Sequence, residues 1–317
     1  MRADRTGAIR KPLSGKIFIT GVSGCVGHYI FELLSKDPGY QFYLLVRNPQ
    51  KLRFDPAAYP NVKIIRDDLK NIKQHADIIR QMDYVVHAAA DWGGNEGNYD
   101  YTLSLFKAID PERCKKIIYF STASILGPNS KPLEEAEAFG THYIRSKYRI
   151  YKKLKELPIK DKVVTLFPAW ILGGDPDHPY SHATQGIRQL KNWLWLIRFF
   201  TIDASFHFIH ARDIALIVQY LLKSQTDKQD YVLGNPPVSA SQFLKETCNF
   251  FGQKVCCQLP ISLPLVKVLA FLTGRKLHPW DLYCFERRYF VYQTVDPKSF
   301  GLESALDTVG AILKSVT

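Results

Sequence analysis

A tyrosine and a lysine four residues apart, Tyr143 and Lys147, are the residues of this chain whose types and spacing best suit acid–base chemistry. On a helix, side chains at this spacing lie on the same face. A free phenol has a pKa of about 10 and exchanges protons poorly at neutral pH, but a nearby ammonium favours the phenolate. The pair therefore predicts a tyrosine that exchanges a proton with a substrate oxygen.

Three glycines near the start of the chain predict a binding site for phosphate groups. Gly21, Gly24 and Gly27 follow the apolar run 17–19 and precede the amphipathic segment 29–34. A helix that begins after a glycine turn offers unpaired N–H groups and the positive end of its dipole, and the glycines let a pyrophosphate approach the backbone. The pattern alone also fits an ordinary tight turn. Motifs elsewhere in the chain are needed to distinguish a nucleotide site from such a turn.

Apolar segments of strand character alternate with helical patterns along most of the chain. This alternation is typical of βαβ units, in which helices cover both faces of a parallel sheet. We therefore expect an α/β fold, a Rossmann-type doubly wound parallel sheet with a smaller C-terminal substrate-binding lobe. The expected strands cover residues 17–19, 41–46, 62–65, 84–90, 116–121, 163–167 and 206–210, and the expected helices 29–34, 72–82, 99–109, 143–157, 211–222, 239–251 and 261–272.

Five motifs, in order, resemble those of the extended short-chain dehydrogenase/reductase superfamily, whose members include NAD-dependent epimerases and dehydratases. The resemblance covers about residues 15–317 and is nearest to the branch of dihydroflavonol reductases and 3β-hydroxysteroid dehydrogenases. The motifs are TGVSGCVG at 20–27 (family TGxxGxxG), VVHAAA at 85–90 (VxHxAA), IYFSTASILG at 118–127 (YxSSxxxxG), YIRSK at 143–147 (YxxSK) and FIHARDIA at 208–215 (FIHVxDxA).

The resemblance implies a role for each matching residue. Tyr143 would be the acid–base group during hydride transfer to or from a nicotinamide, Lys147 would tune it and bind the nicotinamide ribose, and Thr122 would be the catalytic hydroxyl. His87 is expected to be a packed strand residue. The residues expected to bind the cofactor are Gly21, Ser23, Gly24, Cys25, Val26, Gly27, Arg47, Lys51, Asp68, Leu69, Ala88, Ala89, Ala90, Tyr143, Lys147 and Pro168.

Arg47 and Lys51 decide which cofactor we expect. A site that prefers NAD places a carboxylate after the second strand, whereas an arginine accommodates a 2′-phosphate. Here the strand ends in Arg47, and no acidic residue follows until Asp55. A guanidinium suits phosphate geometry and Lys51 adds a point charge. We expect NADP(H), with NAD(H) as the second choice and a solvated basic turn as the alternative.

The substrate side departs from the pattern of sugar-modifying relatives. Nucleotide-sugar dehydratases carry Asp-Glu after the catalytic Thr, where this chain has Ala123 and Ser124. In the family's RPxNxYG stretch, Phe167 replaces the Arg and Trp170 stands at the Asn. Pockets are mostly apolar with few polar anchors, so Trp92, Ser124 and Trp170 are our candidates for substrate contacts. The aromatic residues fit a packed core equally well.

The leading hypothesis is an NADP(H)-dependent oxidoreductase that interconverts a ketone or aldehyde and an alcohol on a hydrophobic or aromatic small molecule. An alternative is a nucleotide-sugar epimerase or dehydratase with tightly bound NAD. A further alternative is a non-catalytic dinucleotide-binding or RNA-binding protein on the same fold, although such relatives commonly lose the Tyr or Lys that this chain retains.

The net charge of +12 admits nucleic acid, an anionic membrane or an anionic ligand as partner. Lys and Arg are spread along the chain, so we expect a solvated basic surface and no nucleic acid. Segment 261–272 has one charge and basic residues after it, which fits either a helix packed on the lobe or peripheral membrane association. A homodimer is a further partner implied by the superfamily.

Six cysteines show no Cys-x-x-Cys spacing, so we expect reduced thiols, no metal site and a cytoplasmic protein. Residues 1–14 carry basic residues without an apolar core, which predicts a flexible leader and no signal peptide. We expect a nucleotide-binding domain at 15–174 and a substrate lobe at 175–317, with 206–222 returning to the first domain.

Overall fold

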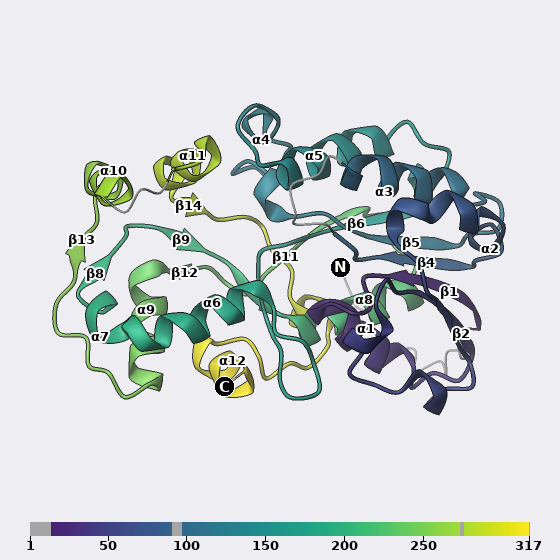
Figure 1. Ribbon diagram of the computed structural model, residues 1–317, viewed down its shortest axis with the longest axis horizontal. Helices are drawn as coiled ribbons and strands as arrows, with labels where there is room; N and C mark the ends of the chain where they lie inside the picture. Colours follow the sequence, from purple (N-terminus) through teal and green to yellow (C-terminus); the bar gives the residue numbers. More distant parts are fainter. Residues whose placement is uncertain (1–13, 91–96, 273–275, 317) are drawn as a thin grey trace, which may run out of the picture.

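A seven-stranded sheet forms the frame of the larger part of the protein (Figure 1). The computed structural model describes residues 14–90, 97–272 and 276–316, and every strand pair in this sheet is parallel. The order of the strands across the sheet is β11 (Asp230–Leu233), β6 (Val163–Pro168), β5 (Lys116–Phe120), β4 (Tyr84–His87), β1 (Gly15–Thr20), β2 (Tyr40–Leu45) and β3 (Val62–Ile65).

Helices cover both faces of this sheet (Figure 1). On one face α1 (Cys25–Leu34) packs against α8 (Ala211–Lys223), and on the other α3 (Gly97–Ala108) packs against α5 (His142–Leu154) and lies beside the short α2 (Ala76–Ile79). Two separate apolar clusters fill the two interfaces. Both faces of the sheet are buried, which explains why its strands are nearly continuous apolar runs. The predicted doubly wound sheet is confirmed.

Three segments differ from the sequence-based expectation. The helix expected at 72–82 begins as a 3₁₀ turn, η3 (Leu69–His75), which starts at the Asp68 cap, and only α2 within it is α-helix. The strand expected at 206–210 is split at His207 into β9 (Ser205–Phe206) and β10 (Phe208–His210), which pair with different strands. The sheet also includes β11, which lies outside the 206–222 segment that we expected to return to it.

The smaller lobe consists of helices and very short strands (Figure 1). Its helices and strands are α6 (His182–Leu190), α7 (Leu194–Ile197), α9 (Ala240–Phe250), α10 (Leu263–Leu272), α11 (Pro279–Arg287), α12 (Val309–Val316), β8 (Phe200–Thr201), β9, β12 (Val238–Ser239), β13 (Leu259–Pro260) and β14 (Tyr289–Phe290).

The remaining elements connect these two parts or lie in turns at their edges. They are α4 (Glu134–Ala138), β7 (Trp170–Leu172), β10 and the 3₁₀ turns η1 (Pro49–Lys51), η2 (Pro56–Ala58), η4 (Ala123–Ile125), η5 (Lys160–Lys162), η6 (Lys191–Trp193) and η7 (Pro297–Phe300). Residues 1–13, nearly all of the expected leader, lie outside the described residues.

Candidate active site

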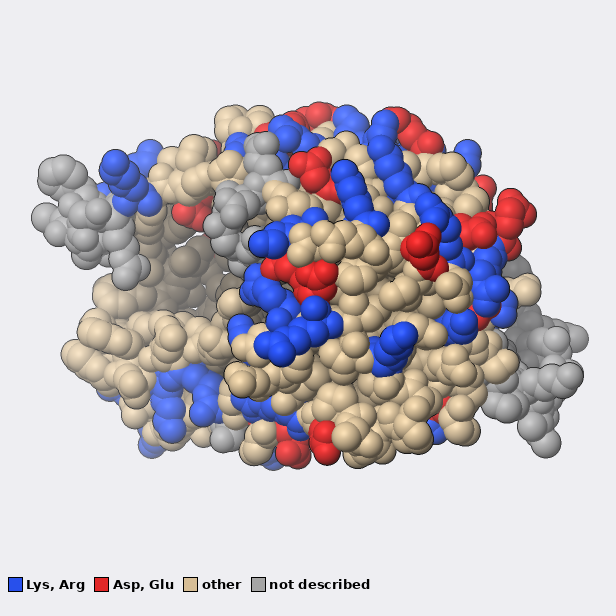
Figure 2. Space-filling model, turned by 45° about the vertical axis from the view of Figure 1, so that its right-hand side comes forward, with Lys and Arg blue, Asp and Glu red and all other residues tan. Residues whose placement is uncertain are grey.

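A cleft of about 2130 Å³ lies between the carboxyl ends of the sheet strands and the lobe. Figure 2 shows a hollow in this region, at the left of the view. Ligands of open α/β sheets bind outside the carboxyl ends of the strands, where the strand order reverses. In this protein the order reverses between β1 and β4, and the residues that follow both strands line the cleft.

The glycine turn after β1 is packed so closely that no side chain fits. Gly21 has a φ of +81°, and a Cβ on it would lie 2.5 Å from the backbone nitrogen of Ala89. A Cβ on Gly27 would lie 2.2 Å from the carbonyl oxygen of Gly21. Gly24 caps α1 without a side-chain hydrogen bond, so the first turn of the helix is open to an anion. The turn therefore has the shape that a dinucleotide pyrophosphate requires.

Helix α5 brings Tyr143 and Lys147 to the same cleft as Thr122, which follows β5. The Thr122 hydroxyl is hydrogen-bonded to the Tyr143 phenol. Lys147 is only 4% exposed, and its Nζ donates a 2.6 Å hydrogen bond to the Phe120 carbonyl oxygen. That nitrogen lies 5.8 Å from the centre of the Tyr143 ring. The three predicted catalytic residues are therefore neighbours.

Burial controls the protonation of this group. It raises the pKa of Tyr143, although the hydrogen bond from Thr122 acts in the opposite direction. Burial also lowers the pKa of Lys147 to about 7. We expected the ammonium to favour the phenolate, but in the protein alone burial outweighs any such effect on the pKa of Tyr143. A protonated Tyr143 at neutral pH is suited to donate a proton to a carbonyl oxygen.

The opposite end of the cleft is basic. Arg47 follows β2 and is 74% exposed, and its Nη1 lies 3.4 Å from the Asp68 carboxylate. Asp68 also caps η3 by accepting a hydrogen bond from the Lys70 amide. Arg47, Lys51 and Asp68 all line the cleft. The end of β2 carries no acidic residue. Instead, Asp68 in the turn after β3 places its carboxylate beside Arg47.

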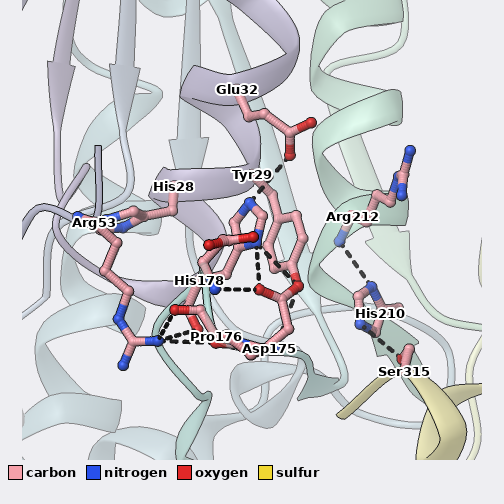
Figure 3. A network of polar contacts seen from close by, with 12 residues as sticks. His28, Tyr29, Glu32, Arg53, Asp175, Pro176, His178, His210, Arg212 and Ser315 are labelled. Carbon is pink, nitrogen blue, oxygen red and sulfur yellow. Dashed lines mark hydrogen bonds and ion pairs between the residues drawn. The ribbon is translucent and has the colours of Figure 1, made fainter. Parts of the chain in front are cut away.

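Every predicted cofactor residue lines this one cleft. Gln50 and Arg53, which were not predicted from the sequence, line it as well. Arg53 Nη1 donates to the carbonyl oxygens of Asp175, Pro176 and His178 at 2.8, 2.9 and 3.2 Å (Figure 3). Its partners lie more than 120 positions away in the chain, so no local sequence signal could have revealed it.

The loop at 175–178 is fastened to α1 beside the glycine turn (Figure 3). The His178 ring stacks on Tyr29 with centroids 3.8 Å apart, and its two nitrogens lie 2.8 Å from the Asp175 carboxylate and 3.1 Å from the Glu32 carboxylate. Tyr29 donates a 2.9 Å hydrogen bond to Asp175. These contacts hold the loop at the edge of the predicted pyrophosphate site.

The lobe side of the cleft is largely apolar. Trp170 is 52% exposed and lies 4.8 Å, between ring centroids, from Phe206. Ser124 also lines the cleft, whereas Trp92 lies outside the described residues. Leu194 and Ile197, from an aromatic-rich run that fits an apolar substrate, line the cleft too. Lining residues not predicted from the sequence are Leu190, Phe243, Leu244, Trp280, Phe285, Arg288, Phe290 and Tyr292.

Two buried histidines, His87 and His207, have structural roles. His87 is fully buried and hydrogen-bonded through both ring nitrogens to the hydroxyls of Thr20 and Thr102, as expected of a packed strand residue. His207 donates to the Asn235 carbonyl oxygen and accepts from the Tyr292 amide. Within the described residues no group of three or more His, Cys, Asp or Glu could hold a metal. All six cysteines are free thiols.

The doubly wound fold and the glycine turn have the features of a dinucleotide-binding protein, and the comparison with protein families agrees. Residues 17–234 match the NAD dependent epimerase/dehydratase family. The protein therefore belongs to this family, as its motifs predict. Comparison with the curated proteins gave no match.

Solved structures of low sequence identity share the fold. The crystal structure of gox2253 superposes with a TM-score of 0.71 at 21% identity, over 94% of this chain and 96% of the other. WbmG from Bordetella bronchiseptica, in complex with NAD, gives 0.67 at 16% identity over 97% and 94%. UDP-glucose 4-epimerase from Thermotoga maritima, with UDP-glucose, gives 0.64 at 15% identity over 95% and 97%.

Proposed function

We propose that this protein is an NAD(P)-dependent oxidoreductase that interconverts a carbonyl and an alcohol on a small molecule. The observation that carries the proposal is the meeting of Thr122, Tyr143 and Lys147 in one cleft with the glycine turn. A turn without an acid–base group would only bind a dinucleotide, and an acid–base pair without the turn would have no hydride donor nearby.

The bound dinucleotide would supply or accept the hydride. Tyr143 donates its proton to the substrate oxygen in the reducing direction and takes it back in the oxidising direction. The Thr122 hydroxyl, already hydrogen-bonded to Tyr143, orients the substrate oxygen where negative charge develops. Lys147 is held by the Phe120 carbonyl and would bind the nicotinamide ribose.

We propose NADP(H) as the preferred cofactor. Arg47 and Lys51 line the end of the cleft, and Arg47 is exposed enough to reach a 2′-phosphate. Its contact with Asp68 at 3.4 Å is long and exposed, so exchanging it for a phosphate costs little. NAD(H) remains the alternative, and Asp68 is the carboxylate that would favour it.

We propose a substrate with a substantial apolar part. Leu194, Phe206 and Phe243 line the lobe side of the cleft, where Arg288 is the one Lys or Arg among the described lining residues of the lobe. A nucleoside diphosphate needs several cationic or polar partners, whereas an apolar molecule gains from burial against these side chains. The lining thus favours a hydrophobic or aromatic ketone or alcohol.

A nucleotide-sugar epimerase or dehydratase is the second candidate, and specific observations favour it. The family model is named for these activities, and several structures of similar fold are named as nucleotide-sugar enzymes. Such an enzyme uses the same hydride step but keeps its NAD through turnover. Arg288, in the cleft, is the residue that would face a diphosphate.

One experiment separates the two candidates. The purified protein is incubated with deuterated NADPH or NADH and a panel of apolar ketones, and in parallel with UDP-sugars without added cofactor. The proposal predicts one deuterium on the alcohol carbon and net consumption of NADPH. Epimerised or dehydrated UDP-sugar, with NAD retained, would instead establish the second candidate. Transfer of deuterium by a Tyr143→Phe variant at the full rate would contradict the assigned mechanism.

A further inference from the structure

Large apolar side chains are exposed at the end of the lobe, away from the sheet. They come from η6 and α7, from β13 and from the start of α10, and they are between 39 and 62% exposed. Soluble surfaces carry single apolar residues without consequence, whereas several exposed apolar side chains at one end of a lobe, tryptophans among them, point to an interaction site. We call this group the lobe-end surface, and it comprises Trp193, Trp195, Leu196, Leu259 and Leu265.

Pairing of two short strands brings the segments that carry these residues to the same end of the lobe, although they are distant in the sequence. β8 pairs with β13, with Phe200 opposite Leu259, and the Leu259 amide donates a 2.8 Å hydrogen bond to the Phe199 carbonyl oxygen. α7 ends just before β8, and α10 begins just after β13. Figure 1 shows α7, β8, β13 and α10 together at the left end of the molecule.

The segments that carry the lobe-end surface contain basic residues and no acidic residue. Segment 182–202 has Arg188, Lys191 and Arg198, segment 247–280 has four more Lys and Arg, and neither contains Asp or Glu. Six of these seven cationic residues lie in the described part of the chain, and the side chains of Lys191, Lys254, Lys267 and Lys276 are exposed there. Elsewhere the charges mix: Figure 2 shows Lys and Arg interspersed with Asp and Glu over the larger part.

The same stretch of chain connects the lobe-end surface to the cleft. Leu190, Leu194 and Ile197 line the cleft, while Trp193 and Trp195 between them are exposed. A molecule at the lobe-end surface is therefore separated from the cleft by a single layer, η6 and α7.

We propose that the lobe-end surface docks on an anionic lipid bilayer, with its tryptophans at the level of the headgroups. Trp is enriched at membrane interfaces because its ring is apolar and its N–H is polar. Lys and Arg around an apolar face attract the negative leaflet, and apolar side chains then enter the headgroup region. Docking is peripheral, since no helix within the described residues is long and apolar enough to cross a bilayer.

This charge pattern disfavours a second copy of the chain as the occupant of the surface. A second copy would bring the exposed lysines Lys191, Lys254 and Lys267 against themselves, which is unfavourable. A corollary, which rests on the proposed function, is that the substrate is a lipid-soluble ketone or alcohol that enters the cleft from the bilayer past η6 and α7.

Vesicle binding tests the surface without any need for turnover. The full-length protein is sedimented with vesicles of phosphatidylcholine alone and with vesicles containing an equal amount of phosphatidylglycerol. We expect binding to the anionic vesicles that weakens strongly at about 1 M salt. Each lysine near an anionic surface strengthens binding about fivefold. The double variant Lys191→Glu, Lys254→Glu should therefore bind at least about tenfold more weakly, and so should Trp193→Ala, Trp195→Ala.

Two matched controls change surface charge or an exposed aromatic side chain on the larger part of the protein, away from the lobe-end surface. Lys155→Glu with Lys160→Glu reverses two exposed charges on the larger part, and Phe139→Ala removes an aromatic residue that is 46% exposed there. Both controls should bind vesicles like the unaltered protein. The proposal fails if the unaltered protein ignores both kinds of vesicle or if the controls lose binding equally. It fails too if Trp193 and Trp195 prove to hold a dimer that does not bind lipid.

Turnover of ketones delivered in two ways tests the corollary that the substrate enters the cleft from the bilayer. With a ketone delivered in vesicles, the two lobe-end variants should turn over more slowly, and with a water-soluble ketone they should match the unaltered protein. Vesicle binding without any reductase activity would leave the surface established and refute the proposed function. Equal loss of turnover in both assays would refute the corollary.

Discussion

The seven-stranded part and the lobe bury their apolar residues in different ways. In the sheet, strands such as β6 are buried along their whole length between two layers of helices. In the lobe, β8, β9, β12, β13 and β14 are two residues long, and tryptophans and leucines remain exposed. The sheet therefore provides a rigid support for the chemistry, and the lobe provides an adaptable apolar wall for the substrate and, we propose, for a membrane.

Because the seven-stranded part supports the site of Thr122, Tyr143 and Lys147, we expect changes in that site to abolish turnover. Tyr143→Phe removes the proton donor and should lower turnover about 10²- to 10⁴-fold. Cofactor affinity should stay within about twofold, because the glycine turn is untouched. Steady-state kinetics and a fluorescence titration with NADPH measure the two effects. Tyr148→Phe, on the same helix but outside the cleft lining, is the control and should keep full activity.

A glycine in the sheet part and one in the lobe should respond in opposite directions to the same change. Gly27→Ala forces a Cβ to within 2.2 Å of a backbone oxygen and should cost about 3 kcal/mol, the upper end for overpacking. A Cβ on Gly310 of α12 meets nothing within 4 Å, so Gly310→Ala should stabilise by up to about 1 kcal/mol. Urea unfolding measures the stability of both variants. Equal destabilisation by the two changes would contradict the difference in packing between the seven-stranded part and the lobe.

The junction of the two parts should make stability depend on pH through Asp213. This α8 residue is 1% exposed, accepts a 2.6 Å hydrogen bond from Ser304, and burial raises its pKa from 3.8 to about 6. Because the folded protein binds this proton more tightly than the unfolded chain, the contribution is present below pH 3.8 and is lost as the pH rises through about 6. The loss amounts to about 2 to 3 kcal/mol.

Asp213→Asn removes this titration. The difference in unfolding free energy between the unaltered protein and the variant should shift by that amount in favour of the variant between about pH 4 and pH 7. Urea unfolding at several pH values measures it. A constant difference across this range would show that Asp213 stays ionised in the folded protein.

The smallest predicted effect concerns the choice of cofactor at the edge of the sheet. Arg47→Ala should weaken NADPH binding about tenfold and leave NADH binding nearly unchanged, because one exposed charge-assisted contact to the 2′-phosphate is lost. Paired titrations with the two nucleotides measure it. Arg66→Ala, an exposed arginine nearby that does not line the cleft, should change neither. If the two affinities fall equally at Arg47, the NADP(H) preference is wrong.

Much of the sheet and its site could be predicted because their signals are local. The glycine turn, the Tyr143–Lys147 spacing and the apolar strands each occupy a short stretch, and parallel strands must bring their carboxyl ends to one edge. The lobe carried weaker signals. Two-residue strands have no measurable periodicity, so β8 and β13 could not be recognised, and 206–210 looked like one strand although its two halves pair with different partners.

By itself, then, the sequence determined the doubly wound fold, the dinucleotide turn and the acid–base group, because backbone geometry and helical spacing dictate these from neighbouring residues. Only the tertiary structure decided that burial, and not the Lys147 ammonium, governs the pKa of Tyr143. It also decided that Arg53 fastens a loop more than 120 positions away, and that β8, which follows the exposed tryptophans, pairs with β13. Desolvation and long-range contacts depend on what packs around a residue, and a linear pattern does not contain that information.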